Sequence, residues 1–343
     1  MTTAAICATR EVSWWPSFYR GASYGLDPVG NRMSANSTLP GINPIAGAYN
    51  ADDEISSETY DANGNVIATG GKTYTYDSQN HMITANNGQV TMIYDGDGNR
   101  VSKTVGGVTT QYLVDDLNPT GYAQVVEEVV NGAVTRQYTY GLQRISQNLS
   151  PAVSGNSTWT PSFYVYDGGG SVRQLTNSNG TVTDEYEYDA YGNSFTKSGT
   201  TPNNYLYRGE QYDSDLGLYY LRARYYNPAT GRFLSRDPLD GNGYDPKSLH
   251  KYLYGVGDPV NAIDPTGRDA DAVEDAELDA AEEGTITFWT KDRAVAAITA
   301  AGACALYFND LFDADSGHAN AHLQRQIAIE GMICVSAVII TAW

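Results

Sequence analysis

The stretch "GLYYLRARYYNPATGRFLSRDP", which runs from Gly217 to Pro238, decides the fold. Tyrosines and arginines alternate along parts of it with the period of a β-strand, and "NPATG" in its middle predicts a turn. Aromatic rings with guanidinium groups between them stack by cation–π contact within a sheet. The stretch therefore predicts short strands joined by a turn.

The composition of the whole chain favours β structure and argues against nucleic-acid binding. The 343 residues carry a net charge of −19, and an acidic surface repels phosphate. The 27 Tyr and 35 Gly favour strands and tight turns over helices. The 3 Cys are too few and too scattered for a disulfide framework, and no Cys pair indicates zinc. We expect no cofactor, and no nucleic-acid partner for the β region.

A unit of Tyr-Asp followed by Gly-Asn recurs along the chain, with steps of 16 and 18 residues between Tyr60, Tyr76 and Tyr94. Each unit predicts a strand, a turn and a return strand, with Gly64 and Gly98 at positive φ. One hairpin cannot bury its own face, so the units must stack or extend a common sheet. The units are "YDANGN" from Tyr60, "YDSQNH" from Tyr76, "YDGDGNR" from Tyr94, "YDGGGS" from Tyr166, "YDAYGN" from Tyr188 and a variant, "YGLDPVGNR", from Tyr24.

These units resemble the YD repeats of Rhs proteins, which also occur in Tc-toxin C subunits and teneurins. Residues 188–268, with "YLYRGEQYDSDLGLYYLRARYYNPATGRFLSRDP" and "HKYLYGVGDPVNAIDPTG", resemble the Rhs-associated core domain more specifically. The resemblance implies a mainly β fold: a YD-repeat β-hairpin shell, closed by the core domain as a plug, that encloses a C-terminal polypeptide. The chain is short for this family, so we expect a partial β-cocoon. The expected divisions are an unassigned segment 1–23, a YD-repeat sheet 24–187, a core domain 188–268 and a variable C-terminal segment 269–343.

Two Asp-Pro motifs, "SRDPLDG" with Asp237 and "AIDPTGR" with Asp264, flank a glycine-containing segment. Two carboxyls brought together can share one proton, so that one acts as a base on water while the other protonates the carbonyl oxygen or leaving amine. The spacing alone does not bring them together. These residues alone also fit a simpler interpretation, in which each motif is a solvated turn whose backbone is fixed by proline.

The resemblance adds a role for this pair. In Rhs core domains and Tc-toxin C subunits, the Asp of "RDP" and the Asp of the terminal "DPxG" are associated with aspartyl self-cleavage after the DPxG-X pentapeptide. Transferred here, the pair is Asp237 and Asp264, Arg236 is the charge partner, and the bond is Arg268–Asp269. The composition changes at this bond, since 26 of the 27 Tyr precede it and residues 269–343 hold 13 Asp and Glu against 3 Lys and Arg. The family usually has Leu where Arg268 stands, and an apolar pocket for Leu would hold Arg poorly.

The segment after this bond begins with an acidic, alanine-rich stretch, 269–283, which predicts a solvated helix or a linker. Two uncharged apolar runs follow, Ala294–Phe308 and Gly331–Trp343, each shorter than the ~20 residues that span a bilayer. They predict buried helices of a small α-helical domain, with a membrane-active helical pair as the alternative. His318 and His322 share one face of such a helix and are weak candidates for a metal site, because no third ligand is evident.

Two functions follow from these observations. The first is a polymorphic-toxin carrier whose shell encapsulates or presents its own C-terminal segment as cargo and releases it by self-cleavage. This hypothesis implies an immunity protein, a secretion apparatus and a secreted or cell-surface location, although the first residues lack the pattern of a classical signal peptide. The alternative is a structural or adhesive YD-repeat surface protein, without proteolysis or toxin, that contacts carbohydrate or a cell surface.

Overall fold

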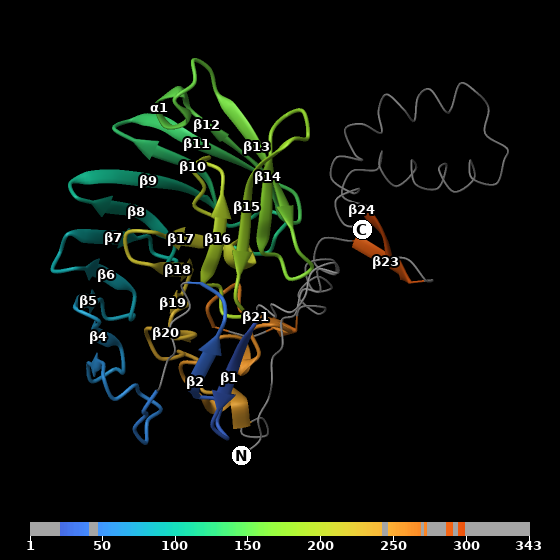
Figure 1. Cartoon of the computed structure of the whole chain (residues 1–343). Coiled ribbons are helices and arrows are strands. Elements are labelled where there is room, and N and C mark those ends of the chain that lie inside the picture. The colour runs from blue at the N-terminus through green and yellow to red at the C-terminus, as the bar shows by residue number, and fades with distance from the viewer. Residues whose placement is uncertain are drawn as a thin grey trace.

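The computed structural model describes residues 21–40, 47–241, 246–268, 271–272, 286–290 and 294–298. Its main element is a 14-stranded antiparallel sheet in which each strand pairs with the next one along the chain. Figure 1 shows this sheet curving from the lower left to the top of the molecule. The strands are β3 (Thr59–Tyr60), β4 (Val66–Thr69), β5 (Lys72–Tyr76), β6 (Met82–Ala85), β7 (Val90–Tyr94), β8 (Arg100–Val105), β9 (Val108–Asp115), β10 (Gln124–Val130), β11 (Ala133–Tyr140), β12 (Arg144–Leu149), β13 (Thr160–Tyr166), β14 (Val172–Thr176), β15 (Val182–Tyr188) and β16 (Ser194–Ser198), with a short helix α1 (Pro151–Ser154) between β12 and β13.

The recurring Asp and Gly-Asn of the repeat build the turns between these strands. In the turn after β3, Asp61 Oδ1 accepts the backbone N–H groups of Asn63 and Asn65, both at 2.9 Å, and its Oδ2 accepts the Asn65 side chain. Gly64 has φ 80°, a conformation that a side chain with a Cβ disfavours. The residues that recur in the repeat are therefore those that make the hydrogen bonds of one local turn. The same three bonds are made by Asp27, Asp95 and Asp189.

In three of the repeats, the tyrosine that precedes the turn ties its hairpin to the previous one. The hydroxyl of Tyr76 donates to the carbonyl of Val66 at 2.9 Å, and that of Tyr94 donates to the carbonyl of Met82 at 2.9 Å. Tyr166 makes the corresponding bond to the carbonyl of Arg144 at 2.7 Å. The ring packs in the core while the hydroxyl satisfies a backbone group, which phenylalanine cannot do.

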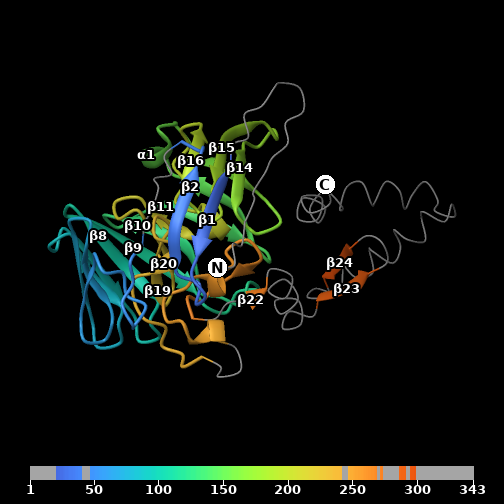
Figure 2. The same cartoon turned by 60° about the horizontal axis from the view of Figure 1, so that its bottom comes forward.

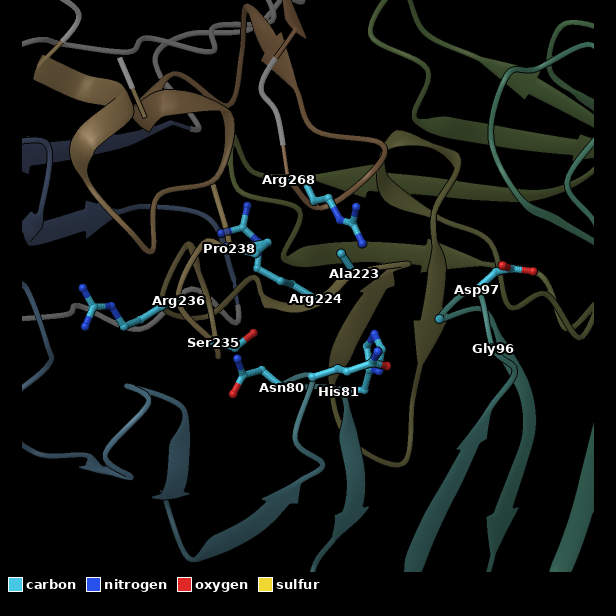
Figure 3. A pocket seen from close by; sticks show the side chains of 12 residues that line it. Asn80, His81, Gly96, Asp97, Ala223, Arg224, Ser235, Arg236, Pro238 and Arg268 are labelled. Carbon is cyan, nitrogen blue, oxygen red and sulfur yellow. The ribbon is translucent and has the colours of Figure 1, made fainter. Parts of the chain in front are cut away.

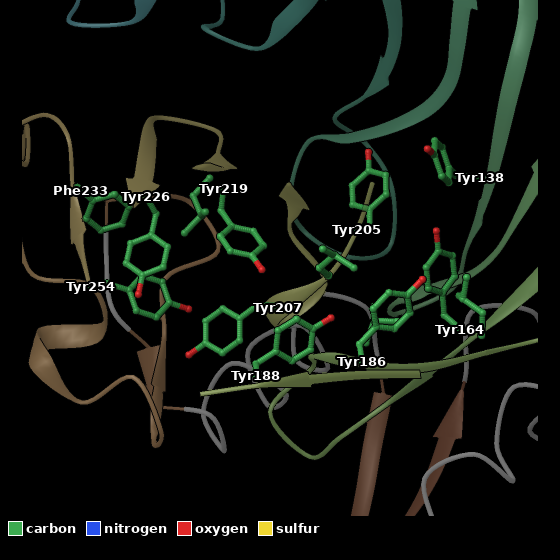
Figure 4. Packing of buried hydrophobic residues seen from close by; sticks show 14 residues of the cluster. Tyr138, Tyr164, Tyr186, Tyr188, Tyr205, Tyr207, Tyr219, Tyr226, Phe233 and Tyr254 are labelled. Atoms are coloured by element: carbon green, nitrogen blue, oxygen red, sulfur yellow. The ribbon is translucent and has the colours of Figure 1, made fainter. Parts of the chain in front are cut away.

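A second, four-stranded sheet lies on the concave side of the large one (Figures 1 and 2). Tyrosines from both sheets share one buried cluster, in which Tyr138, Tyr164 and Tyr186 of the large sheet belong with Tyr219 and Tyr226 of the small one (Figure 4). The opening stretch of the sequence forms most of this inner sheet, and both of its faces are buried. Tyr219 and Tyr226 belong to this first cluster, whereas Tyr220 and Tyr225 belong to a second cluster with earlier strands of the same large sheet. The strands of the inner sheet are β17 (Gln211–Asp213), β18 (Leu218–Leu221), β19 (Arg224–Asn227) and β20 (Arg232–Phe233).

Buried charge joins the two sheets. Arg100, at the start of β8, is fully buried, and its guanidinium pairs with Asp213 of β17 and lies 4.2 Å from the ring centroid of Tyr220. Lys103 of the same strand contacts Asp213 at 2.8 Å. A buried charge is tolerated only when it is paired and hydrogen-bonded, so these contacts fix the position of the inner sheet against the outer one.

The remaining strands form separate hairpins. The variant repeat gives β1 (Ala22–Leu26) and β2 (Arg32–Ser37), which pair with each other. Tyr24 packs edge-on against Tyr191, with ring centroids 4.8 Å apart, and its hydroxyl donates to Asp189 at 2.9 Å. This hairpin therefore packs on the turn between β15 and β16.

The mainly β fold is confirmed, and the C-terminal segment differs from expectation in two described places. Asp271 and Ala272, in the acidic stretch expected to be a solvated helix or a linker, form strand β22 (Asp271–Ala272), which pairs with β21 (Ala262–Ile263). Ala294 to Ile298, the start of an apolar run expected to be helical, is strand β24 (Ala294–Ile298) and pairs with β23 (Ile286–Thr290). The partner sequence "ITFWT" is β-branched and aromatic, which favours a strand over a helix. In the described part of the chain, no helix is long and apolar enough to cross a membrane.

The expected positive φ is confirmed at both glycines, 80° at Gly64 and 85° at Gly98. Gly64→Val and Gly98→Val should each lower the free energy of unfolding by about 1 kcal/mol or more, because a branched side chain is strained there. The loss should be larger at Gly64, where a Cβ would clash with the Arg236 side chain, than at Gly98, where it would meet His81. Gly96→Val is the matched control, since a Cβ there meets nothing within 4 Å. Denaturant unfolding measures all three, and equal stability of the Gly64 and Gly96 variants would contradict the assignment.

Candidate functional site at the aspartate pair

Asp237 and Asp264 meet at one arginine. Arg224, at the start of β19, is buried, and its Nη2 lies 2.7 Å from Asp237 Oδ2 and 3.1 Å from Asp264 Oδ2. The two carboxyl groups therefore reach the same nitrogen, although 27 residues of chain separate them. One guanidinium group therefore brings the two carboxyl groups into the same site.

Arg224 is held in place from several sides. Its Nε donates to the carbonyl of Gly267, and its guanidinium carbon lies 3.7 Å from the ring centroid of Phe233. Asp237 is fixed through its backbone, whose N–H donates to the carbonyl of Lys251 at 2.8 Å. The guanidinium therefore has contacts to both Asp-Pro motifs and to the residues that follow the second.

Burial sets the proton affinity of the pair. Desolvation raises the pKa of Asp264 to about 7, partly offset by the Arg224 charge and by the backbone hydrogen bond from Arg268, and the Asp237 charge raises it further. Desolvation also raises the pKa of Asp237, against the lowering effect of Arg224. Asp264 is therefore partly protonated close to neutral pH, because burial has brought the pKa of its carboxyl into that range.

The segment after Asp264 is bound at the same place. The N–H of Arg268 donates to Asp264 Oδ1 at 2.9 Å. The side chain of Arg268 is exposed and borders a cavity of about 180 Å³, together with Arg224, Arg236 and two turns of the large sheet at residues 79–81 and 96–98 (Figure 3). Arg268 thus lies in a polar pocket, a different environment from the apolar one that a leucine would need.

Arg236, expected to be the charge partner of the aspartate pair, lies elsewhere in the structure. Its side chain is exposed and packs over Gly64, where an added Cβ would clash with it. Side chains of adjacent residues in extended chain point to opposite sides, so a residue next to Asp237 is directed away from the carboxyl pair. The cation at the pair is Arg224 instead. In the sequence, Arg224 is one of several arginines in the "YYLRARYYNPATGRF" stretch, and nothing in the local pattern distinguishes it from the others.

The other candidate residues divide into two groups. Asp258, in the third Asp-Pro motif, closes a local turn by accepting the Asn261 side chain at 2.9 Å. Asp269, His318 and His322 lie outside the described residues. Among the residues that the structure does describe, no group of three or more His, Cys, Asp or Glu side chains is placed to hold a metal ion.

The raised pKa of Asp264 makes a prediction about stability. A carboxyl whose pKa rises from 3.8 in the unfolded chain to about 7 in the folded protein binds a proton on folding, so stability should fall as the pH rises from about 4 to about 7. Asp264→Asn removes this titration. The free energy of unfolding of the variant, relative to that of the parent, should therefore increase with pH across this range, by a few kcal/mol at most. Thermal melts at several pH values measure the difference. Asp258→Asn should follow the parent, and a constant difference between Asp264→Asn and the parent would contradict the assignment.

Comparisons with known proteins place the chain in a family. Residues 48–260, more than half of the chain, match the family model described as Teneurin YD-shell. The tRNA nuclease WapA of Bacillus subtilis (strain 168) is 36% identical over 261 residues, which cover 71% of this chain and 11% of WapA. Toxin protein Tse5 of Pseudomonas aeruginosa is 45% identical over 62 residues, which cover 18% of this chain and 4% of Tse5.

The fold is also shared with a solved structure. The structure of the Photorhabdus luminescens Tc holotoxin pore superposes with a TM-score of 0.58 at 20% identity, over 74% of this chain and 14% of that one. This chain therefore spans a small part of the length of each relative. The turn-building Asp and Gly-Asn units, the tyrosine ties between hairpins and the match over residues 48–260 lead to one conclusion: the chain belongs to the Teneurin YD-shell family.

Proposed function

We propose that this chain acts as an Rhs-type toxin carrier, and that Asp237 and Asp264 cut the Arg268–Asp269 bond. The observation that supports the proposal is the convergence of both carboxyls on Arg224, with Asp264 holding the N–H of Arg268 at 2.9 Å. Two covalent bonds separate that nitrogen from the carbonyl carbon that would be attacked. Arg268, the residue before the proposed cut, is thus hydrogen-bonded to one member of the carboxyl pair.

The chemistry requires one neutral and one ionised carboxyl. The ionised member takes a proton from water, whose oxygen attacks the carbonyl carbon of Arg268, while the neutral member donates its proton to the carbonyl oxygen. The C–N bond then breaks, the nitrogen of Asp269 takes a proton, and the products are a carboxyl group on Arg268 and an amine on Asp269. Asp264, with its pKa of about 7, supports a half-protonated pair at neutral pH.

The relatives support the toxin part of the proposal. WapA is named a tRNA nuclease and Tse5 a toxin protein, and each is far longer than the region that matches here. In this proposal, residues 24–187 supply shell, residues 188–268 supply the core domain, and residues 269–343 are the cargo. A secreted or cell-surface location, a delivery apparatus and an immunity protein that neutralises the cargo follow from the same proposal.

A second function has its own support. Arg224 contacts Asp237, Asp264 and Gly267 at once, which is also what a purely structural clamp at the end of a surface protein would do. A structural or adhesive protein of this kind, in contact with carbohydrate or a cell surface, needs no cleavage. The two functions differ in whether the purified chain stays intact.

Intact-mass measurement of the purified protein separates them. The carrier should yield fragments covering residues 1–268 and 269–343, and Asp237→Asn and Asp264→Asn should each stop the cut, at least about 100-fold in rate. Asp258→Asn and Arg236→Gln are the controls and should be cut at the parental rate, because neither side chain touches the pair. A parent that stays whole would support the structural protein, and cleavage of both Asn variants at the parental rate would assign the cut to an external protease.

A further inference from the structure

The turn between β18 and β19 binds the segment that ends at the proposed bond. Residues 222–224, from this turn and the start of β19, donate to three consecutive carbonyls of that segment: Arg222 Nη1 to Pro265, the Ala223 N–H to Thr266 at 3.2 Å, and Arg224 Nε to Gly267. One donor is a backbone N–H and two are guanidinium groups, so main chain and side chains bind the segment together. All three acceptors belong to the main chain, so the contacts are independent of the side chains at these positions.

Gly267 is the one position in the segment where a side chain is excluded. Its φ is 69°, and an added Cβ would clash with the carbonyl oxygen of Leu221. The close approach of the two backbones therefore requires glycine at this place.

Arg222 is itself positioned by contacts from two other parts of the chain. Its guanidinium pairs with Glu210 at 3.0 Å, its Nε donates to the carbonyl of Ala123 at 3.0 Å, and its guanidinium carbon lies 5.4 Å from the ring centroid of Tyr122. Its backbone φ is 56°, in the left-handed region that arginine rarely adopts. Backbone strain of this kind persists where the surroundings enforce it and is concentrated at functional positions.

We propose that residues 222–224 form a peptide-docking template for residues 265–267, with Arg222 as its positioning residue. The template holds the main chain so that the carbonyl of Arg268 stays beside Asp237 and Asp264, and it keeps the new C-terminal end bound after the cut. The first of these effects rests on the proposed self-cleavage. The docking itself does not, because the three hydrogen bonds exist in the uncut chain.

The test compares two arginines with the same strained backbone. Arg222→Asn keeps a residue that tolerates positive φ but removes the guanidinium. Arg208→Asn is the matched control: Arg208 has φ 55° and donates to carbonyls of Gly169 and Val260, outside the docked segment. Arg222→Asn should slow cleavage at least tenfold without moving the pH at which the rate is half-maximal, since Arg222 does not touch the carboxyl pair. Arg208→Asn should be cut at the parental rate, and equal slowing by both variants would overturn the proposal.

Hydrogen exchange makes the test independent of cleavage. The Ala223 amide, which donates to Thr266, should exchange at least tenfold faster in Arg222→Asn and in Gly267→Ala than in the parent, whether or not the chain is cut. If the parent is not cut but the Ala223 amide exchanges faster in the two variants, the self-cleavage proposal is wrong and the docking proposal is supported. Unchanged exchange at Ala223 in both variants would overturn the docking, whatever the cleavage result.

Discussion

The structure depends on the burial of charge between its two sheets. The 14-stranded sheet has a concave face rich in tyrosine, and a hairpin sheet of this kind is unstable unless that face is covered. The inner sheet covers it, and the ion pairs of Asp213 with Arg100 and Lys103 fix where it lies. Removing one member of a buried pair leaves an uncompensated charge, which typically costs about 3–5 kcal/mol. The outer and inner sheets are therefore expected to be stable together and not apart.

Once the inner sheet is fixed, the site follows from its geometry. Arg224 begins the strand that follows the docking turn, and it lies between the two Asp-Pro motifs because β19 is held in the centre of the molecule. Residues distant in sequence meet here. Desolvation raises the pKa of both carboxyls, and the charge of the shared guanidinium offsets this only in part, so the pKa of Asp264 lies at about 7.

Local features were predictable from the sequence, and contacts between distant segments were not. Asp, Gly and Asn make the turns through bonds that span five residues, so the spacing of the repeat predicts the hairpins and the positive φ of Gly64 and Gly98. The resemblance to Rhs core domains supplied Asp237 and Asp264. It assigned the charge to Arg236, the neighbour in sequence, whereas the cation at the pair, Arg224, is a neighbour in space. The tyrosine bonds to earlier carbonyls, such as Tyr76 to Val66, likewise need the register of the sheet, which no single repeat contains.

The order of strands in the large sheet follows the order of the chain, from β3 to β16. Every pairing in it is thus between neighbours, and no strand waits for a distant partner. Such a sheet can gain or lose a whole hairpin at its early edge without rearranging the others, because each repeat carries its own turn. It can also assemble progressively as the chain leaves the ribosome, with low loop-closure entropy at each step. The inner sheet requires a long-range step and is encoded after β16, so synthesis of the large sheet precedes the formation of the site that would cut the chain.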